Sequence, residues 1–113
     1  MPWLMHDGEV LATAEAATTR AARRRGLLGR DSLEGALVLS PCRQVHTFGM
    51  RFPIDVIWLR SDGRVLRIAT LAPQRVSRPV FRARSVIEAA SGAAGRWRLR
   101  VGDELELRAE AIP

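Results

Sequence analysis

The sequence predicts a mainly β protein, built as a small antiparallel β-sandwich, a jelly-roll-like fold or a partly open barrel with one short N-terminal helix. Two observations carry this prediction. Short apolar segments recur along the 113 residues, and turn signals such as Asp-Gly separate them. The length fits a single domain over residues 1–113. A chain of this size buries roughly two-thirds of its unfolded surface, enough for a core without disulfides or metals.

The N-terminal segment predicts a hairpin followed by a helix. Residues 2–6 form a first strand, Asp7-Gly8 turns the chain, and residues 9–16 return as the second strand. The pair Thr18-Thr19 then offers an N-cap for a short helix that ends at Gly26.

The middle of the chain predicts a second hairpin. Residues 54–59 are apolar on both faces apart from Asp55, which predicts a central strand. Asp62-Gly63 turns this strand into the next one, residues 64–71. Further extended segments are expected at residues 36–39, 45–49, 85–89 and 104–108, with a turn of small residues at 91–95.

The composition limits the class of protein but not its function. All 18 basic residues are arginine, and the formal net charge is +6. This excess suits an anionic partner, and it equally suits a protein that is merely soluble. The one cysteine, Cys42, cannot form an internal disulfide, no apolar run approaches the ~20 residues of a membrane span, and no secretory signal begins the chain. We therefore expect a soluble, cytoplasmic protein, as a monomer or a dimer.

Several motifs together resemble a known bacterial and archaeal family. The most specific is His-Thr-Phe-Gly-Met-Arg-Phe-Pro-Ile-Asp-Val at residues 46–56. Gly-Leu-Leu-Gly-Arg at 26–30, Ala-Arg-Ser-Val-Ile-Glu at 83–88 and Val-Gly-Asp at 101–103 accompany it. Their order and spacing resemble the domain of unknown function 192 family from about Val10 to Leu107.

The resemblance implies a compact, mainly β fold and no particular activity, because the family lacks an assigned reaction. Many of its members carry residues like Met50, Arg51, Pro53 and Asp55. Cys42 and His46 resemble only a subset of the members. The resemblance therefore implies the fold and leaves the function open.

The leading functional hypothesis is a binding or accessory module centred on the turn at residues 46–55. It would hold a small anionic ligand or the extended segment of a partner. The predicted ligand-binding residues are His46, Thr47, Met50, Arg51 and Asp55. A carboxylate such as Asp55 in an apolar strand needs a partner or a raised pKa. Asp55 either forms an ion pair with Arg51 or Arg30 that locks the turn, or lies with Arg51 on the floor of an anion pocket. Glu88 is a second carboxylate in an apolar segment, and it too needs a partner or a raised pKa.

Two other classes remain as alternatives. An enzyme would use Cys42 as a nucleophile activated by His46, with Asp55 orienting the imidazole. A sequence-independent nucleic-acid binder would use Arg20, Arg23 and Arg24, which share one face of the predicted helix. A solvated helix face explains these arginines equally well. We favour a binding module over an enzyme and expect no metal and no cofactor, because one cysteine and two histidines cannot make a closed zinc site without carboxylates.

Overall fold

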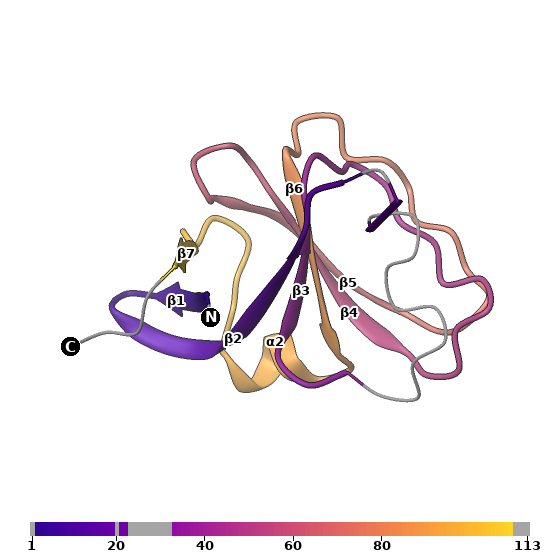
Figure 1. The fold of residues 1–113 in the computed structure, drawn as a ribbon, viewed down its shortest axis with the longest axis horizontal. Helices are drawn as coiled ribbons and strands as arrows, with labels where there is room; N and C mark the ends of the chain where they lie inside the picture. Colours follow the sequence, from indigo (N-terminus) through magenta and orange to yellow (C-terminus); the bar gives the residue numbers. More distant parts are fainter. Residues whose placement is uncertain (1, 20, 23–32, 110–113) are drawn as a thin grey trace.

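The computed structural model describes residues 2–19, 21–22 and 33–109 (Figure 1). Within these ranges lie seven strands and the short helix α2, and no helix there is long and apolar enough to cross a membrane. The elements are β1 (Trp3–His6), β2 (Glu9–Ala17), β3 (Ala36–Leu39), β4 (Ile54–Leu59), β5 (Val65–Leu71), β6 (Ser85–Ala90), α2 (Ala93–Arg96) and β7 (Glu106–Arg108).

The strands form one open sheet in the order β5-β4-β6-β3-β2-β1-β7 (Figure 1). The long strand β2 joins its two parts, because residues 9–13 pair with β1 and residues 14–17 pair with β3. The β2–β3 pair is parallel, whereas every other neighbouring pair is antiparallel. The mainly β prediction is confirmed, and the expectation of a purely antiparallel sheet is wrong. The barrel is not closed, since β5 and β7 are at opposite ends of the strand order.

The hairpin predictions are confirmed. Asp7-Gly8 connects β1 to β2, and Asp62-Gly63 lies between β4 and β5. Gly63 has a φ of +88°, and a side chain there would collide with the backbone carbonyl of Leu105. Glycine is therefore required at this turn both for its backbone conformation and for the close approach of the β7 segment.

Two local expectations differ from the structure. The segment 45–49 contributes only an isolated bridge between His46 and Val76 instead of a strand. Ser91 and Gly92 form the predicted turn, but the small residues that follow continue as α2, because a buried carboxylate described below caps the helix. Most of the predicted N-terminal helix lies outside the described residues, although the Thr19 hydroxyl accepts a hydrogen bond from the Ala22 N–H at 3.0 Å.

The sheet buries side chains on both faces, and β4 shows this most clearly. Ile54, Val56 and Trp58 belong to one core cluster, and Ile57 and Leu59 belong to the other. All six residues of β4 are buried, and β4 pairs with both β5 and β6. The prediction of an interior strand is confirmed. We call the face with Val56 and Trp58 the loop face, because the loops described next pack over it.

Candidate binding surface

Two loops far apart in the sequence run side by side over the loop face of the sheet. They are residues 40–53, between β3 and β4, and residues 72–84, between β5 and β6. Backbone hydrogen bonds join them along their length: Cys42 N–H to Arg84 O (3.0 Å), Val80 N–H to Arg43 O (2.9 Å), Ser77 N–H to Val45 O (2.9 Å) and Thr47 N–H to Arg75 O (2.7 Å). The loops thus form one continuous layer.

Trp58 fixes this layer to the sheet. Its side chain is fully buried on the loop face, and its indole N–H donates a hydrogen bond to the Arg43 carbonyl at 2.9 Å. The guanidinium of Arg67, on β5, lies 5.2 Å from the centre of the indole ring. The exposed side of the loop layer is therefore presented on a rigid support.

Thr47 acts as a clamp between the two loops. It is 0% exposed, and its hydroxyl donates to the Ala72 carbonyl at 2.6 Å and accepts from the Arg75 N–H at 2.9 Å. Its backbone carbonyl accepts from the Gln74 N–H at 3.0 Å. Thr47 therefore positions the loops, and its hydroxyl is not presented to a ligand at the surface.

His46 and Phe48 form a stacked pair on the exposed side of the layer. Their ring centres are 5.4 Å apart with an interplanar angle of 27°. The Nδ1 of His46 also accepts the Phe48 N–H at 3.2 Å. Phe48 remains 50% exposed, so its ring is held in place while one side stays open to solvent.

The two loops carry a concentrated positive charge. They contain no aspartate or glutamate and six exposed arginines, as many positive charges as the formal net charge of the whole chain. These residues are Arg43, Arg51, Arg75, Arg78, Arg82 and Arg84. Apart from Arg51, none of the six forms an ion pair with another described residue. The charge of the other five arginines is thus left for solvent or for an anionic partner.

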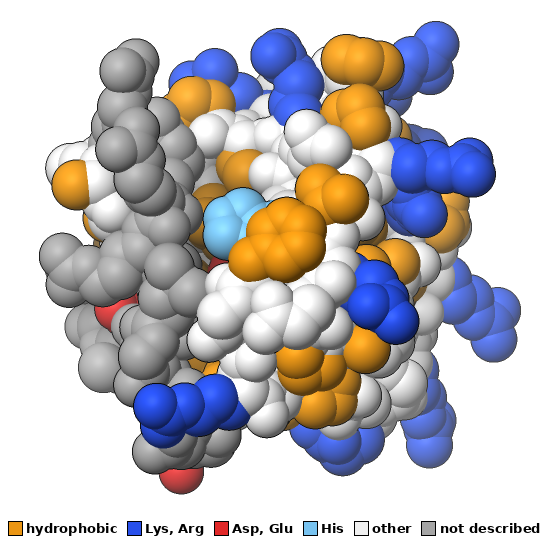
Figure 2. Space-filling view, turned by 90° about the vertical axis from the view of Figure 1, so that its right-hand side faces the viewer, with side chains coloured by type: hydrophobic (Ala, Val, Ile, Leu, Met, Phe, Trp, Pro, Cys, Tyr) orange, Lys and Arg blue, Asp and Glu red, His pale blue; other side chains and the backbone are white. Residues whose placement is uncertain are grey.

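Exposed apolar side chains lie among these arginines. Besides Phe48, Val76 is 57% exposed and Phe81 is 79% exposed. Figure 2 views this end of the molecule and shows hydrophobic side chains in its middle with basic side chains around them. We call the exposed side chains of both loops the loop surface: Arg43, His46, Phe48, Arg51, Arg75, Val76, Arg78, Phe81, Arg82 and Arg84.

A cavity of about 350 Å³ opens at one end of the loop layer. Both loops line it, with Pro41, Cys42, Arg43 and Gln44 on one side and Ala83 and Arg84 on the other. The Cys42 thiol donates a weak hydrogen bond to the Gln44 carbonyl at 3.3 Å. Two arginines and a partly exposed thiol give this cavity the chemistry to take a small anionic group.

Asp55 lies on the opposite face of the sheet from these loops. Because side chains alternate along a strand, Asp55 shares the face of Ile57 and Leu59. Its carboxylate is 3% exposed and accepts hydrogen bonds from the Thr70 hydroxyl (2.8 Å), the Gly92 N–H (3.1 Å) and the Ala94 N–H (3.0 Å). Arg51 is not among its partners, and Arg30 lies outside the described residues. α2 has no acidic residue in its own first turn. Asp55 therefore caps the helix from a neighbouring strand.

Glu88 lies on the loop face, in the middle of the sheet. Its neighbours on the adjoining strands are Leu37 and Val56, and it is 3% exposed. The aliphatic side chains of Leu37 and Val56 therefore flank its carboxyl group on both sides. Burial raises the pKa of Glu88 to about 7.

The structure thus brings together only part of the predicted site. His46 and Arg51 are exposed on the loop surface, whereas Met50 packs in the core and Thr47 is buried. Asp55 faces away from His46 and Cys42, so the group proposed for nucleophilic catalysis is not assembled. Arg20, Arg23 and Arg24 lie outside the described residues, and no metal-binding cluster of three His, Cys, Asp or Glu side chains occurs among the residues the structure does describe.

The sequence reasoning missed the loop at 72–84. Arg75, Arg78 and Phe81 belong to it, and none of them was a predicted site residue. The signal was present, since four arginines and no carboxylate occur between Ala72 and Arg84.

Comparison with known proteins places the chain in a family. Residues 3–107 match DUF192, the family described as "Uncharacterized ACR". Two UPF0127 proteins, from Pyrococcus horikoshii and Pyrococcus abyssi, are each 39% identical to the chain over 62 residues, or 55% of it. The match spans 54% and 53% of the lengths of these two relatives, about half of each.

Two solved structures share the fold. A protein of unknown function from Novosphingobium aromaticivorans DSM 12444 has a TM-score of 0.79 and 24% identity, over 93% of this chain and 82% of that one. A proposed transcription regulator from Sinorhizobium meliloti 1021 has a TM-score of 0.78 and 22% identity, over 93% and 90%. The predicted family resemblance is confirmed: the chain belongs to the DUF192 family, which is uncharacterised.

Proposed function

We propose that the protein is a binding module whose loop surface holds an anionic partner. One observation carries this proposal: two paired loops expose six arginines without a single carboxylate. Opposite charge near these guanidinium groups is favourable, and their planar forks match carboxylate and phosphate oxygens. The predicted cytoplasmic location belongs to the same proposal.

The shape of the loop surface favours an extended partner over a small enclosed ligand. The nearby cavity is open and lies at one end of the loops, whereas most of the arginines are spread over the exposed side of both loops. A small ligand would contact only a few of them. An extended anion can contact many at once, with the cavity taking one of its charged groups.

Binding of inorganic polyphosphate tests this proposal, because this polymer carries charge and no other recognition feature. We expect affinity that falls steeply as salt is added, since salt screens exposed charges. The double variant Arg75→Ala/Arg78→Ala should weaken binding about tenfold at low salt, which corresponds to the loss of about 1.4 kcal/mol.

A matched control removes the same number of charges elsewhere. Arg96 and Arg100 are exposed arginines in and after α2, away from both loops. Arg96→Ala/Arg100→Ala should leave binding nearly unchanged. Equal losses in the two double variants would mean that only net charge matters, and the loop surface would then have no specific role.

A further inference from the structure

We infer that the anionic partner is a single-stranded nucleic acid, whose bases stack on Phe48 and Phe81 while its phosphates contact the arginines around them. This inference rests on the proposed function and specifies its ligand. The loop surface combines positive charge with exposed aromatic rings, and single-stranded nucleic acids are bound by these two features together.

Phe48 is prepared as a stacking platform. One side of its ring lies against His46, at 5.4 Å between ring centres, and the hydrogen bond from its N–H to Nδ1 of His46 holds the backbone. Half of the side chain remains exposed. A base could therefore extend the stack without moving the protein, which keeps the entropic cost of binding small.

Phe81 offers a second ring. It is 79% exposed, the highest value among the large hydrophobic residues described as exposed. Its backbone position is fixed on both sides, since Val80 N–H donates to Arg43 O at 2.9 Å and Ala83 N–H donates to Val80 O at 3.0 Å. Arg82 follows it directly, so a phosphate contact and a stacked base are available at neighbouring positions.

The same features disfavour other anionic polymers. Double-stranded nucleic acid keeps its base faces inside the helix, where the phenylalanine rings cannot reach them. An acidic polypeptide would satisfy the arginines but has no need for two projecting rings. Rings that project from a surface suit flat partners, and unpaired bases have two open faces.

Fluorescence anisotropy with a labelled oligonucleotide of about 12 nucleotides tests the inference. The reference ligand is an abasic deoxyribose-phosphate oligomer of the same length and charge. We expect the base-bearing strand to bind the protein about 5- to 150-fold more tightly than the abasic strand, for each base that stacks. Phe81→Ala should reduce this difference by a similar factor and leave the affinity for the abasic strand unchanged.

Phe81→Trp and Phe48→Trp keep a flat ring and should retain tight binding, which separates stacking from simple loss of the side chain. Phe81 is the cleaner position, because its high exposure makes a folding defect in Phe81→Ala unexpected, and a thermal unfolding curve of each variant confirms the fold.

The outcomes separate this inference from the proposed function. If base-bearing and abasic strands bind equally, stacking is refuted, while the anion-binding surface stands. If a poly-glutamate peptide of equal charge binds as tightly as the oligonucleotide, an acidic protein becomes the partner and the inference is wrong. If the protein binds no oligonucleotide and no polyphosphate, both proposals fail.

Discussion

Asp55 and Glu88 are both buried carboxylates on neighbouring strands, but the two faces of the sheet treat them differently. Each is 3% exposed, and Val56, next to Asp55 on β4, pairs with Glu88 on β6. On one face three donors surround Asp55. On the loop face, Glu88 lies between Leu37 and Val56, and its burial raises its pKa to about 7. A buried acid is thus a structural cap on one face and a titratable group on the other.

The difference follows from what covers each face. α2 begins above Asp55, and the N–H groups at its start need acceptors that the helix itself cannot provide. The loop face instead packs Glu88 between the aliphatic side chains of Leu37 and Val56, which favour the neutral carboxyl. The arginines of the loops above it are exposed.

The largest effect is expected at Asp55. Asp55→Ala removes the acceptor of three hydrogen bonds and leaves the buried Ala94 N–H without a partner. We expect the free energy of unfolding to fall by about 3–5 kcal/mol, measured by urea denaturation. Thr70→Val, which removes one donor only, should cost about 1 kcal/mol. Equal losses in the two variants would contradict the assignment of Asp55 as the cap of α2.

Removing the charge of Glu88 should change the free energy of unfolding in the opposite direction and stabilise the protein. Its pKa in the folded protein, about 7, lies above the ordinary value of 4.5, so the folded state binds the proton more tightly. Glu88 should therefore lower stability progressively as pH rises from about 4.5 to 7, with a constant penalty above that. Glu88→Gln removes this penalty, and we expect it to stabilise the protein by roughly 2–3 kcal/mol at pH 8 relative to its effect at pH 4.

Urea denaturation of the native protein and of Glu88→Gln across pH 4–8 measures this difference. A parallel pH dependence in the two proteins would show that Glu88 does not titrate in this range, and the contrast with Asp55 would disappear.

The variant Thr47→Val tests how much the hydrogen bonds of the loop layer contribute to stability, compared with those that cap α2. Thr47→Val keeps the size of the side chain but leaves the Ala72 carbonyl and the Arg75 N–H without the hydroxyl. We expect a loss of about 1–2 kcal/mol in the free energy of unfolding and faster amide hydrogen exchange at Arg75 and Gln74. Unchanged exchange at these two amides would show that other contacts hold the loops together.

The sequence predicted what depends on neighbouring residues. Asp7-Gly8 and Asp62-Gly63 each turn the chain between two strands that follow one another in the sequence, and both hairpins occur. The short apolar segments of β3, β4 and β6 were also predicted correctly. These elements need only local turn chemistry and a buried side-chain pattern.

The remaining features depend on contacts between distant residues. The parallel pairing of β2 with β3 depends on how the chain returns between them, and no local pattern encodes that return. The donors to Asp55 are separated from it by 15 to 39 residues, and Thr47 finds its partners 25 and 28 residues away. A single sequence shows that Asp55 needs partners, but it does not show which ones.

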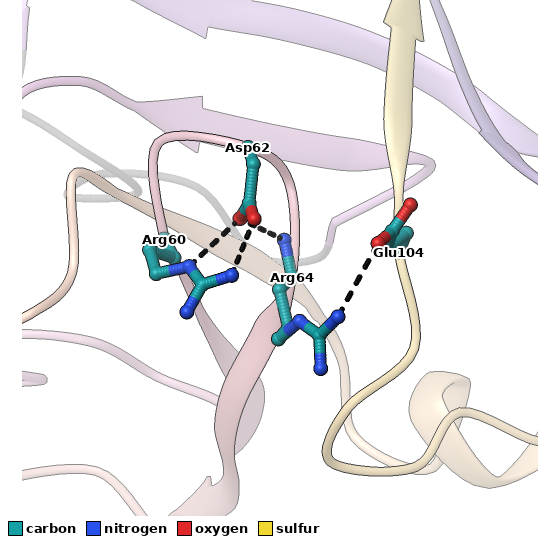
Figure 3. Close-up of polar contacts among 4 residues, drawn as sticks. All are labelled: Arg60, Asp62, Arg64 and Glu104. Atoms are coloured by element: carbon teal, nitrogen blue, oxygen red, sulfur yellow. Dashed lines mark hydrogen bonds and ion pairs between the residues drawn. The ribbon is translucent and has the colours of Figure 1, made fainter.

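An exposed carboxylate should have the smallest effect of all. Asp62, in the turn after β4, lies beside the guanidinium of Arg60 and accepts the Arg64 N–H at 3.1 Å, while Arg64 contacts Glu104 (Figure 3). The Arg60 hydrogen bonds hold the pKa of Asp62 well below its ordinary value. Because the group is exposed, water and salt screen this attraction.

Asp62→Asn removes the charge and keeps an oxygen that can accept the Arg64 N–H. In the native protein, the Asp62 carboxylate stabilises the fold above the ordinary aspartate pKa, and this contribution is lost only as pH falls below that value. We therefore expect the urea midpoint at pH 7 to shift less than in Thr47→Val, and the shift to shrink further as sodium chloride is added. A shift as large as that of Asp55→Ala would mean that pairing with arginine, and not burial with satisfied hydrogen bonds, determines how much a carboxylate stabilises this fold.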